Sequence, residues 1–160
     1  MISVMFVCHG NICRSPMAEF VFKDLVNKRG LSGDFFVASS ATSGEEIVGG
    51  VGNPIYPPAA RELALRGIPF EFRRATRLQK SDYEKYDYFL CMDTYNLQNA
   101  LAIFGGDPEG KCRLLKSFTK QGGQVPDPWY SGDFKKAFDD IFTGCGAVLD
   151  EILKNGGKSK

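Results

Sequence analysis

The sequence of 160 residues lacks features that mark several classes of protein. No hydrophobic run reaches the roughly 20 residues that a membrane-spanning helix needs, so we expect no membrane contact. The formal net charge is only +1 and no basic cluster is present, which argues against a nucleic-acid partner. The sequence has no internal repeat. Because its first residues already have a strand pattern, we expect no secretory segment and a cytoplasmic protein.

Histidine and cysteine are too few and too scattered for a metal centre. His9 is the only histidine, and the five cysteines lack the paired spacing of metal sites. An odd number of cysteines fits reduced thiols in the cytoplasm better than a disulfide framework. We therefore expect no metal and no cofactor. Three of the cysteines lie in apolar segments and are expected in the core: Cys91, Cys112 and Cys145.

The sequence does contain alternating strand and helix patterns. With 43% hydrophobic residues, it can bury one substantial core, so we expect a single domain over residues 1–154 and a flexible tail over 155–160. Strands are predicted at 2–7, 35–40, 86–92 and 112–115, and helices at 16–29, 58–66, 94–104 and 134–153, around an irregular middle. This alternation predicts an α/β sandwich with parallel strands and right-handed crossovers.

The turn after the first strand has the composition of an anion site. The unpaired N–H groups and positive dipole of a helix that starts near Pro16 favour a phosphate or a thiolate. Gly10 lets the backbone curl, and Arg14 adds a planar fork that matches two oxygens. Since ligands of such folds bind at the carboxyl ends of the strands, this loop is the candidate site.

Cys8 begins this turn, directly after the strand. Thiols beside a helix N-terminus and an arginine ionise more readily than free thiols. Ser15 can donate a hydrogen bond to the sulfur, and Asn11 tolerates left-handed backbone. The expected result is a nucleophilic thiolate that faces a bound phosphate ester.

The stretch from Cys8 to Glu19, CHGNICRSPMAE, resembles the signature loop of the low-molecular-weight protein tyrosine phosphatases. The segment DPWY at 127–130 and the segment YDYFLCMD at 86–93 extend the resemblance over nearly the whole chain. It implies a four-stranded parallel sheet flanked by helices. It also implies metal-free hydrolysis of phosphotyrosine and small aryl phosphates through a cysteinyl phosphate.

The resemblance also assigns roles to single residues. Cys8 is then the nucleophile, Arg14 clamps the phosphoryl oxygens, and Asp127 is the general acid, held on extended backbone between two prolines rather than in a helix. The loop N–H groups from His9 to Arg14 would stabilise charge. The residues expected to bind phosphate are His9, Gly10, Asn11, Ile12, Cys13 and Ser15, and those expected at the pocket mouth are Trp129 and Tyr130.

Several of these residues have a second interpretation. Asp127 could be a turn residue, and Trp129 and Tyr130 could be core aromatics. Cys13 could form a reversible disulfide with Cys8, as in family members, or pack inward. The His9 side chain is expected to point away from the site.

The segment from Gly44 to Pro58 departs from the family pattern. It has no tryptophan and no Asp-x-Arg pair. We expect Ile47, Val48 or Tyr56 to supply the pocket wall opposite Trp129, so substrate preference is the property most open to change.

Three other functions use a similar loop. A protein-arginine phosphatase is distinguished by a threonine at the position of Ile12. An arsenate reductase needs further cysteines to relay a disulfide, and a phosphate-binding adaptor would not need both Cys8 and Asp127. The expected partners are phosphotyrosine-containing proteins or small phosphomonoesters, and the expected state is a monomer, with a weak dimer as the alternative.

Overall fold

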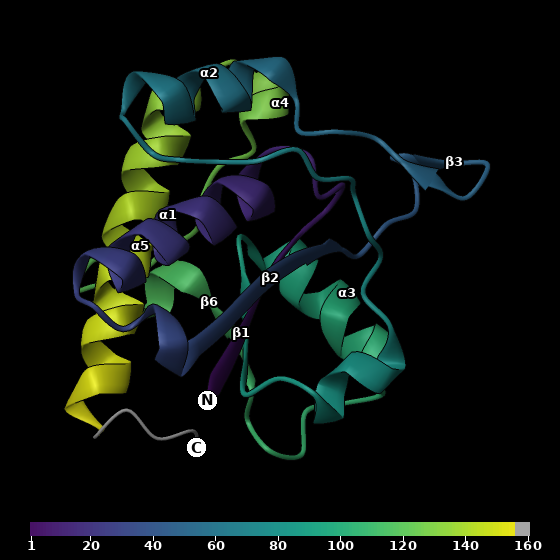
Figure 1. Cartoon of the computed structure of the whole chain (residues 1–160). Helices are drawn as coiled ribbons and strands as arrows, with labels where there is room; N and C mark the ends of the chain where they lie inside the picture. Colours follow the sequence, from purple (N-terminus) through teal and green to yellow (C-terminus); the bar gives the residue numbers. More distant parts are fainter. Residues whose placement is uncertain (156–160) are drawn as a thin grey trace.

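The computed structural model describes residues 1–155, so the predicted tail lies outside the described residues except for Asn155. One sheet contains four strands in the order β2-β1-β5-β6, and all its neighbouring pairs are parallel (Figure 1). The strands are β1 (Ile2–Cys8), β2 (Phe35–Ala41), β5 (Tyr88–Cys91) and β6 (Cys112–Leu114). The predicted fold class, an α/β sandwich with a four-stranded parallel sheet, is confirmed.

Helices cover both faces of this sheet. The helices α1 (Arg14–Lys28) and α5 (Phe134–Lys154) pack on one face, and α3 (Thr94–Phe104) packs on the other. Each face of the sheet has its own hydrophobic core. Because side chains alternate along a strand, Phe6 of β1 lies in the core on the side of α1 and α5, and Val7 lies in the core on the side of α3. Both are fully buried, which explains why β1 reads as an apolar run.

The predicted helices and strands end within about two residues of the observed ones. Pro57 starts α2 (Pro57–Leu65), Asp93 caps α3, and Gly105 ends α3 with a φ of 76°. The prediction that three cysteines lie in the core is also confirmed, with exposed fractions of 0% for Cys91, 9% for Cys112 and 0% for Cys145.

The short elements were not predicted. β3 (Ile47–Val48) and β4 (Val51–Gly52) form a small hairpin that projects from the body (Figure 1), and Gly49 and Gly50 make its turn with φ of 60° and 81°. The other short elements are α4 (Pro128–Ser131) and the 3-10 helices η1 (Ser32–Asp34), η2 (Lys80–Glu84) and η3 (Leu115–Phe118).

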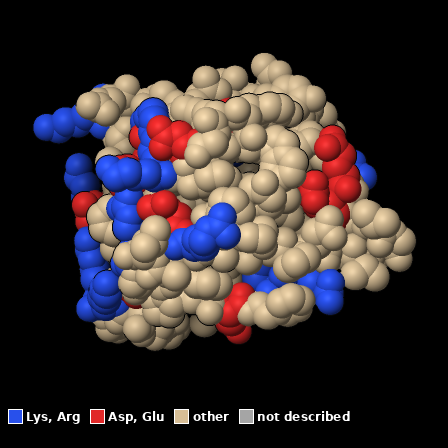
Figure 2. All heavy atoms as spheres, turned by 90° about the horizontal axis from the view of Figure 1, so that it is seen from above, with Lys and Arg blue, Asp and Glu red and all other residues tan. Residues whose placement is uncertain are grey.

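The carboxyl ends of β1 and β5 meet at the upper end of the molecule in Figure 1, near α2 and α4. The strand order reverses between these two strands, and open α/β sheets bind ligands at such a point. Seen from above in Figure 2, most of the basic side chains of this face lie on the left with acidic ones among them, and a separate group of acidic side chains lies on the right. No helix within residues 1–155 is both long and apolar enough to cross a membrane.

Candidate active site

The loop between β1 and α1 is held by hydrogen bonds to its carbonyl oxygens. The Thr42 N–H donates to the Cys8 oxygen at 2.9 Å, the Ser43 N–H to the His9 oxygen at 3.0 Å, and the Tyr56 N–H to the Ile12 oxygen at 2.8 Å. Because these carbonyls face the neighbouring segments, N–H groups of the loop turn toward its centre. This is the geometry of an anion nest.

Cys8 Sγ lies inside this loop, and the residue is only 3% exposed. The sulfur is 3.0 Å from Ser15 Oγ, and it accepts from the N–H of Asn11 at 3.3 Å and from the N–H of Ser15 at 3.4 Å. Donors around a sulfur stabilise a negative charge on it, as does the start of α1. The site is therefore suited to a thiolate.

Asn11 has a φ of 59°, so its backbone is left-handed, as its residue type allows. The side-chain Nδ2 donates to Ser15 Oγ at 2.7 Å and to Ser39 Oγ at 3.0 Å, and Oδ1 accepts from the N–H of Thr76 at 3.0 Å. The Asn11 side chain thus ties the loop to β2 and to the segment around Thr76.

The Arg14 guanidinium is only 2% exposed and is fixed by acceptors on other elements. Its Nη1 donates to Asp93 Oδ2 and to the Val125 oxygen, both at 2.8 Å. Burial acts to lower the pKa of Arg14, but negative charge from Cys8 and the nearby carboxylates outweighs this effect and raises the pKa. Arg14 therefore stays a rigid cation beside the sulfur.

Asp127 has the extended backbone that its flanking prolines predict, and it lies outside a helix as expected, although the short helix α4 that begins at Pro128 was not predicted. Its carboxylate caps α4, because Oδ1 accepts from the N–H of Trp129 at 3.0 Å. Oδ2 lies 3.4 Å from Arg14 Nη2. A proline at the first helical position and an aspartate before it allowed this single turn, which is too short to leave a periodic signal.

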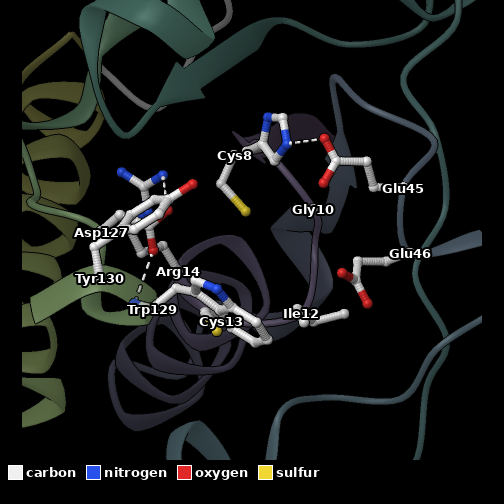
Figure 3. A pocket seen from close by; sticks show the side chains of 11 residues that line it. Cys8, Gly10, Ile12, Cys13, Arg14, Glu45, Glu46, Asp127, Trp129 and Tyr130 are labelled. Carbon is white, nitrogen blue, oxygen red and sulfur yellow. Dashed lines mark hydrogen bonds and ion pairs between the residues drawn. The ribbon is translucent and has the colours of Figure 1, made fainter. Parts of the chain in front are cut away.

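A pocket opens over the sulfur. Figure 3 shows Asp127, Trp129 and Tyr130 on one side of Cys8, with Glu45 and Glu46 on the other. Trp129 is 52% exposed and Tyr130 is 85% exposed, so neither is a core aromatic. The lining residues are Cys8, His9, Gly10, Ile12, Cys13, Arg14, Glu45, Glu46, Asp127, Trp129 and Tyr130.

The prediction for the wall opposite Trp129 is wrong. Ile47 packs against Ile12 and Cys13, and Val48 is 68% exposed. The Tyr56 ring packs against the Trp129 ring, with ring centroids 4.7 Å apart. None of these three predicted residues lines the pocket. Two carboxylates border it in their place: Glu45 and Glu46.

The His9 side chain does not point away either, because it lies at the pocket edge and pairs through Nε2 with Glu45 Oε2 at 2.8 Å. The backbone N–H of His9 donates to the side-chain oxygen of Asn96 at 3.3 Å, with the Asn96 amide oriented to satisfy both of its groups. The N–H group of His9 thus faces α3. The prediction that the N–H groups from His9 to Arg14 all stabilise charge at the phosphate site is therefore wrong for His9.

Cys13 lines the pocket but is only 6% exposed. Burial, aided by the negative charge of Cys8, raises its pKa far above the ordinary value, so Cys13 is a neutral thiol. Within residues 1–155, no group of three or more His, Cys, Asp or Glu side chains is placed to hold a metal ion.

Sequence reasoning missed the residues that reach the loop from elsewhere in the chain: Ser39, Glu45, Glu46, Arg73, Thr76, Asp93 and Asn96. Asp93 could have been found, because it follows β5 at the carboxyl edge of the sheet, where ligand-side groups gather. Arg73 left no signal, because it lies in a segment without periodicity.

Known proteins resemble the chain over nearly its full length. The family described as "Low molecular weight phosphotyrosine protein phosphatase" matches residues 3–158. The low molecular weight protein-tyrosine-phosphatase YfkJ of Bacillus subtilis is 36% identical over 96% of this chain and 97% of the relative. The human low molecular weight phosphotyrosine protein phosphatase is 38% identical over 93% and 94%.

Two solved structures share the fold. The crystal structure of YfkJ superposes with a TM-score of 0.91 and covers 97% of this chain and 96% of its own. A structure of the YwlE arginine phosphatase has a TM-score of 0.80 at 25% identity, with coverage of 96% and 97%. With the family match across residues 3–158, these similarities show that the chain belongs to the low molecular weight phosphotyrosine protein phosphatase family.

Proposed function

We propose that this protein hydrolyses phosphotyrosine in proteins, and small aryl phosphates, through a phosphate ester on Cys8. One observation carries the proposal. A shielded sulfur, a fixed guanidinium and a carboxylate border one pocket, with Arg14 Nη2 only 3.4 Å from Asp127 Oδ2. Nucleophile, anion clamp and proton donor are thus within reach of one phosphate group.

In the first step the Cys8 thiolate attacks phosphorus. The sulfur–phosphorus bond forms as the bond from phosphorus to the phenolic oxygen breaks, and Asp127 gives its proton to that oxygen. Arg14 and inward-facing N–H groups of the loop hold the other phosphoryl oxygens.

In the second step a water molecule attacks phosphorus. Asp127, now a carboxylate, accepts a proton from the water while the sulfur–phosphorus bond breaks. The products are inorganic phosphate and the Cys8 thiolate, and Asp127 is again protonated. The charge on the transferred group is balanced throughout by Arg14 and the loop.

Ile12 and the aromatic side of the pocket favour phosphotyrosine over phosphoarginine. Ile12 is a branched alkyl side chain, 8% exposed, at the wall of the pocket. A phenyl ring meets this surface favourably, whereas a guanidinium next to phosphorus would lose water there without gaining a hydrogen bond. The Trp129 ring extends the apolar surface toward the pocket mouth.

We therefore predict a higher kcat/KM for phosphotyrosine peptides than for matched phosphoarginine or phosphoserine peptides. Ile12→Thr should narrow or reverse the difference between phosphotyrosine and phosphoarginine. Val48→Thr also replaces a branched alkyl side chain by threonine, but on the exposed hairpin, and should leave the ratio unchanged. A preference of the unmodified protein for phosphoarginine would replace our assignment with that of an arginine phosphatase.

An arsenate reductase fits the cysteines less well. Cys91 and Cys112 belong to the core on the α3 side of the sheet, whereas Cys8 belongs to the core on the α1 side. Thiols separated by a sheet cannot relay a disulfide without rearrangement of the fold. We also propose that the protein acts as a monomer in the cytoplasm, which suits its five free cysteines.

A further inference from the structure

Two arginines hold the phosphate-binding loop, and only Arg14 belongs to the motif. Arg73 reaches the loop from the irregular segment between α2 and η2. One terminal nitrogen of its guanidinium donates to the backbone oxygen of Asn11 at 2.8 Å, and the other donates to Asn11 Oδ1. Arg73 therefore grips both the backbone and the side chain of the left-handed residue on which the loop turns.

These two hydrogen bonds determine which groups donate and which accept in a hydrogen-bond chain that ends at Cys8 Sγ. Because Oδ1 of Asn11 accepts from Arg73 and from the N–H of Thr76, the Nδ2 group must face the other way. There it donates to Ser15 Oγ at 2.7 Å. The Ser15 hydroxyl has a single proton, which is then free to point at Cys8 Sγ, 3.0 Å away.

Arg73 also brings a positive charge into a partly buried place. Burial lowers the pKa of the Arg73 guanidinium, and the negative charges of Glu19 and Cys8 act against this effect. An arginine stays protonated even so. A charge shielded from water acts more strongly on its neighbours than an exposed one, so it stabilises a thiolate at Cys8.

We propose that Arg73 is a positioning residue and the second cation of the site. It holds Asn11 so that Ser15 donates to the Cys8 sulfur, and its charge helps to keep that sulfur anionic. The inference rests on the proposed function only in taking Cys8 as the reactive thiol.

The test is the rate of Cys8 alkylation by iodoacetamide between pH 5 and pH 9, followed by peptide mapping of the intact chain. Arg73→Met removes the charge and both hydrogen bonds, and alkylation at pH 6 should be about tenfold slower than in the unmodified protein, with the rates converging at high pH. Arg73→Lys keeps the charge, so its rate at pH 6 should be within about threefold of the unmodified protein.

Arg74→Met is the matched control, because the exposed Arg74 side chain bonds the Gly52 oxygen and lies over the Phe72 ring, outside the site. Its profile should match that of the unmodified protein. Circular dichroism checks folding, and Arg73→Gln takes the place of Arg73→Met if that variant does not fold.

Three results would overturn the inference: an Arg73→Met profile equal to that of the unmodified protein, a loss of rate that is equal at every pH, or an Arg73→Lys rate as low as that of Arg73→Met. Alkylation needs no phosphatase substrate. A failure of this inference is therefore distinguishable from a failure of the proposed activity.

Discussion

In the proposed mechanism, the proton transfer of the first step depends on Asp127. This residue is placed by its cap on α4 and by its contact with Arg14, and both contacts can persist with an amide in its place. Asp127→Asn should slow turnover of phosphotyrosine by roughly 10²–10⁴-fold, the usual size of general acid catalysis. The loss should be smaller for p-nitrophenyl phosphate, whose leaving group needs no proton.

The ratio of the two losses is the informative quantity, and steady-state kinetics on both substrates give it. Asp133→Asn makes the same change at the N-terminal cap of α5 and should leave both rates nearly unchanged. An equal loss on both substrates would mean that Asp127 only shapes the loop.

We predict that Cys13 determines how the proposed site responds to oxidation. It is buried and neutral beside the Cys8 sulfur, so peroxide should oxidise Cys8 first, to a sulfenic acid. The Cys13 thiol can then displace water from that acid to form a disulfide, which dithiothreitol reverses. Cys13→Ser should accumulate irreversible sulfinic and sulfonic forms of Cys8 sooner.

Peptide mapping after peroxide treatment measures both products. Cys112→Ser removes a buried thiol from the other core and should behave like the unmodified protein. The absence of a bridge between Cys8 and Cys13 would leave Cys13 with a packing role only.

At the scale of single elements, α5 contains two glycines that differ in what surrounds them. A methyl group on Gly144 would lie 2.7 Å from Leu115 Cγ, in the 3-10 helix η3, whereas nothing lies within 4 Å of the same position on Gly146. Gly144 thus allows α5 to pack closely against η3, whereas no packing contact requires a glycine at position 146.

Gly144→Ala should therefore destabilise the protein by about 1–3 kcal/mol through overpacking. Gly146→Ala should stabilise it by about 0.5–1 kcal/mol, because alanine favours the helix. Urea unfolding measures both differences. If Gly144→Ala proves as stabilising as Gly146→Ala, the close contact with Leu115 is not a constraint.

The length of each element and the residues at its ends explain which elements could be predicted. The main strands and helices carry apolar patterns long enough to identify, and their ends carry prolines, an aspartate cap or a glycine. The hairpin of β3 and β4 has strands of two residues, which are too short for a pattern. Its Gly49-Gly50 turn was the only available signal, and missing it led to the wrong assignment of Ile47 and Val48 to the pocket wall.

For the whole molecule, the site is assembled from segments that are distant in sequence. The motif from Cys8 to Ser15 could be identified because its groups are contiguous. Asp93, which holds Arg14 from 79 residues away, and Arg73, which holds Asn11 from 62 residues away, depend on how the chain folds back on itself. Asp93 could be expected only from its place just after β5, at the carboxyl edge of the sheet, and no local pattern predicts Arg73.

The central claim is that the phosphate passes through the Cys8 sulfur, and trapping that ester tests it most directly. In Asp127→Asn, p-nitrophenyl phosphate should still react in the first step, while the second step is slowed for lack of a base. We predict a burst of p-nitrophenol equal to the amount of enzyme, and acid-quenched peptide mapping should find the phosphate on Cys8. Cys8→Ser should show no burst and still bind vanadate. Phosphate on any other residue, or sustained turnover by Cys8→Ser, would contradict the account.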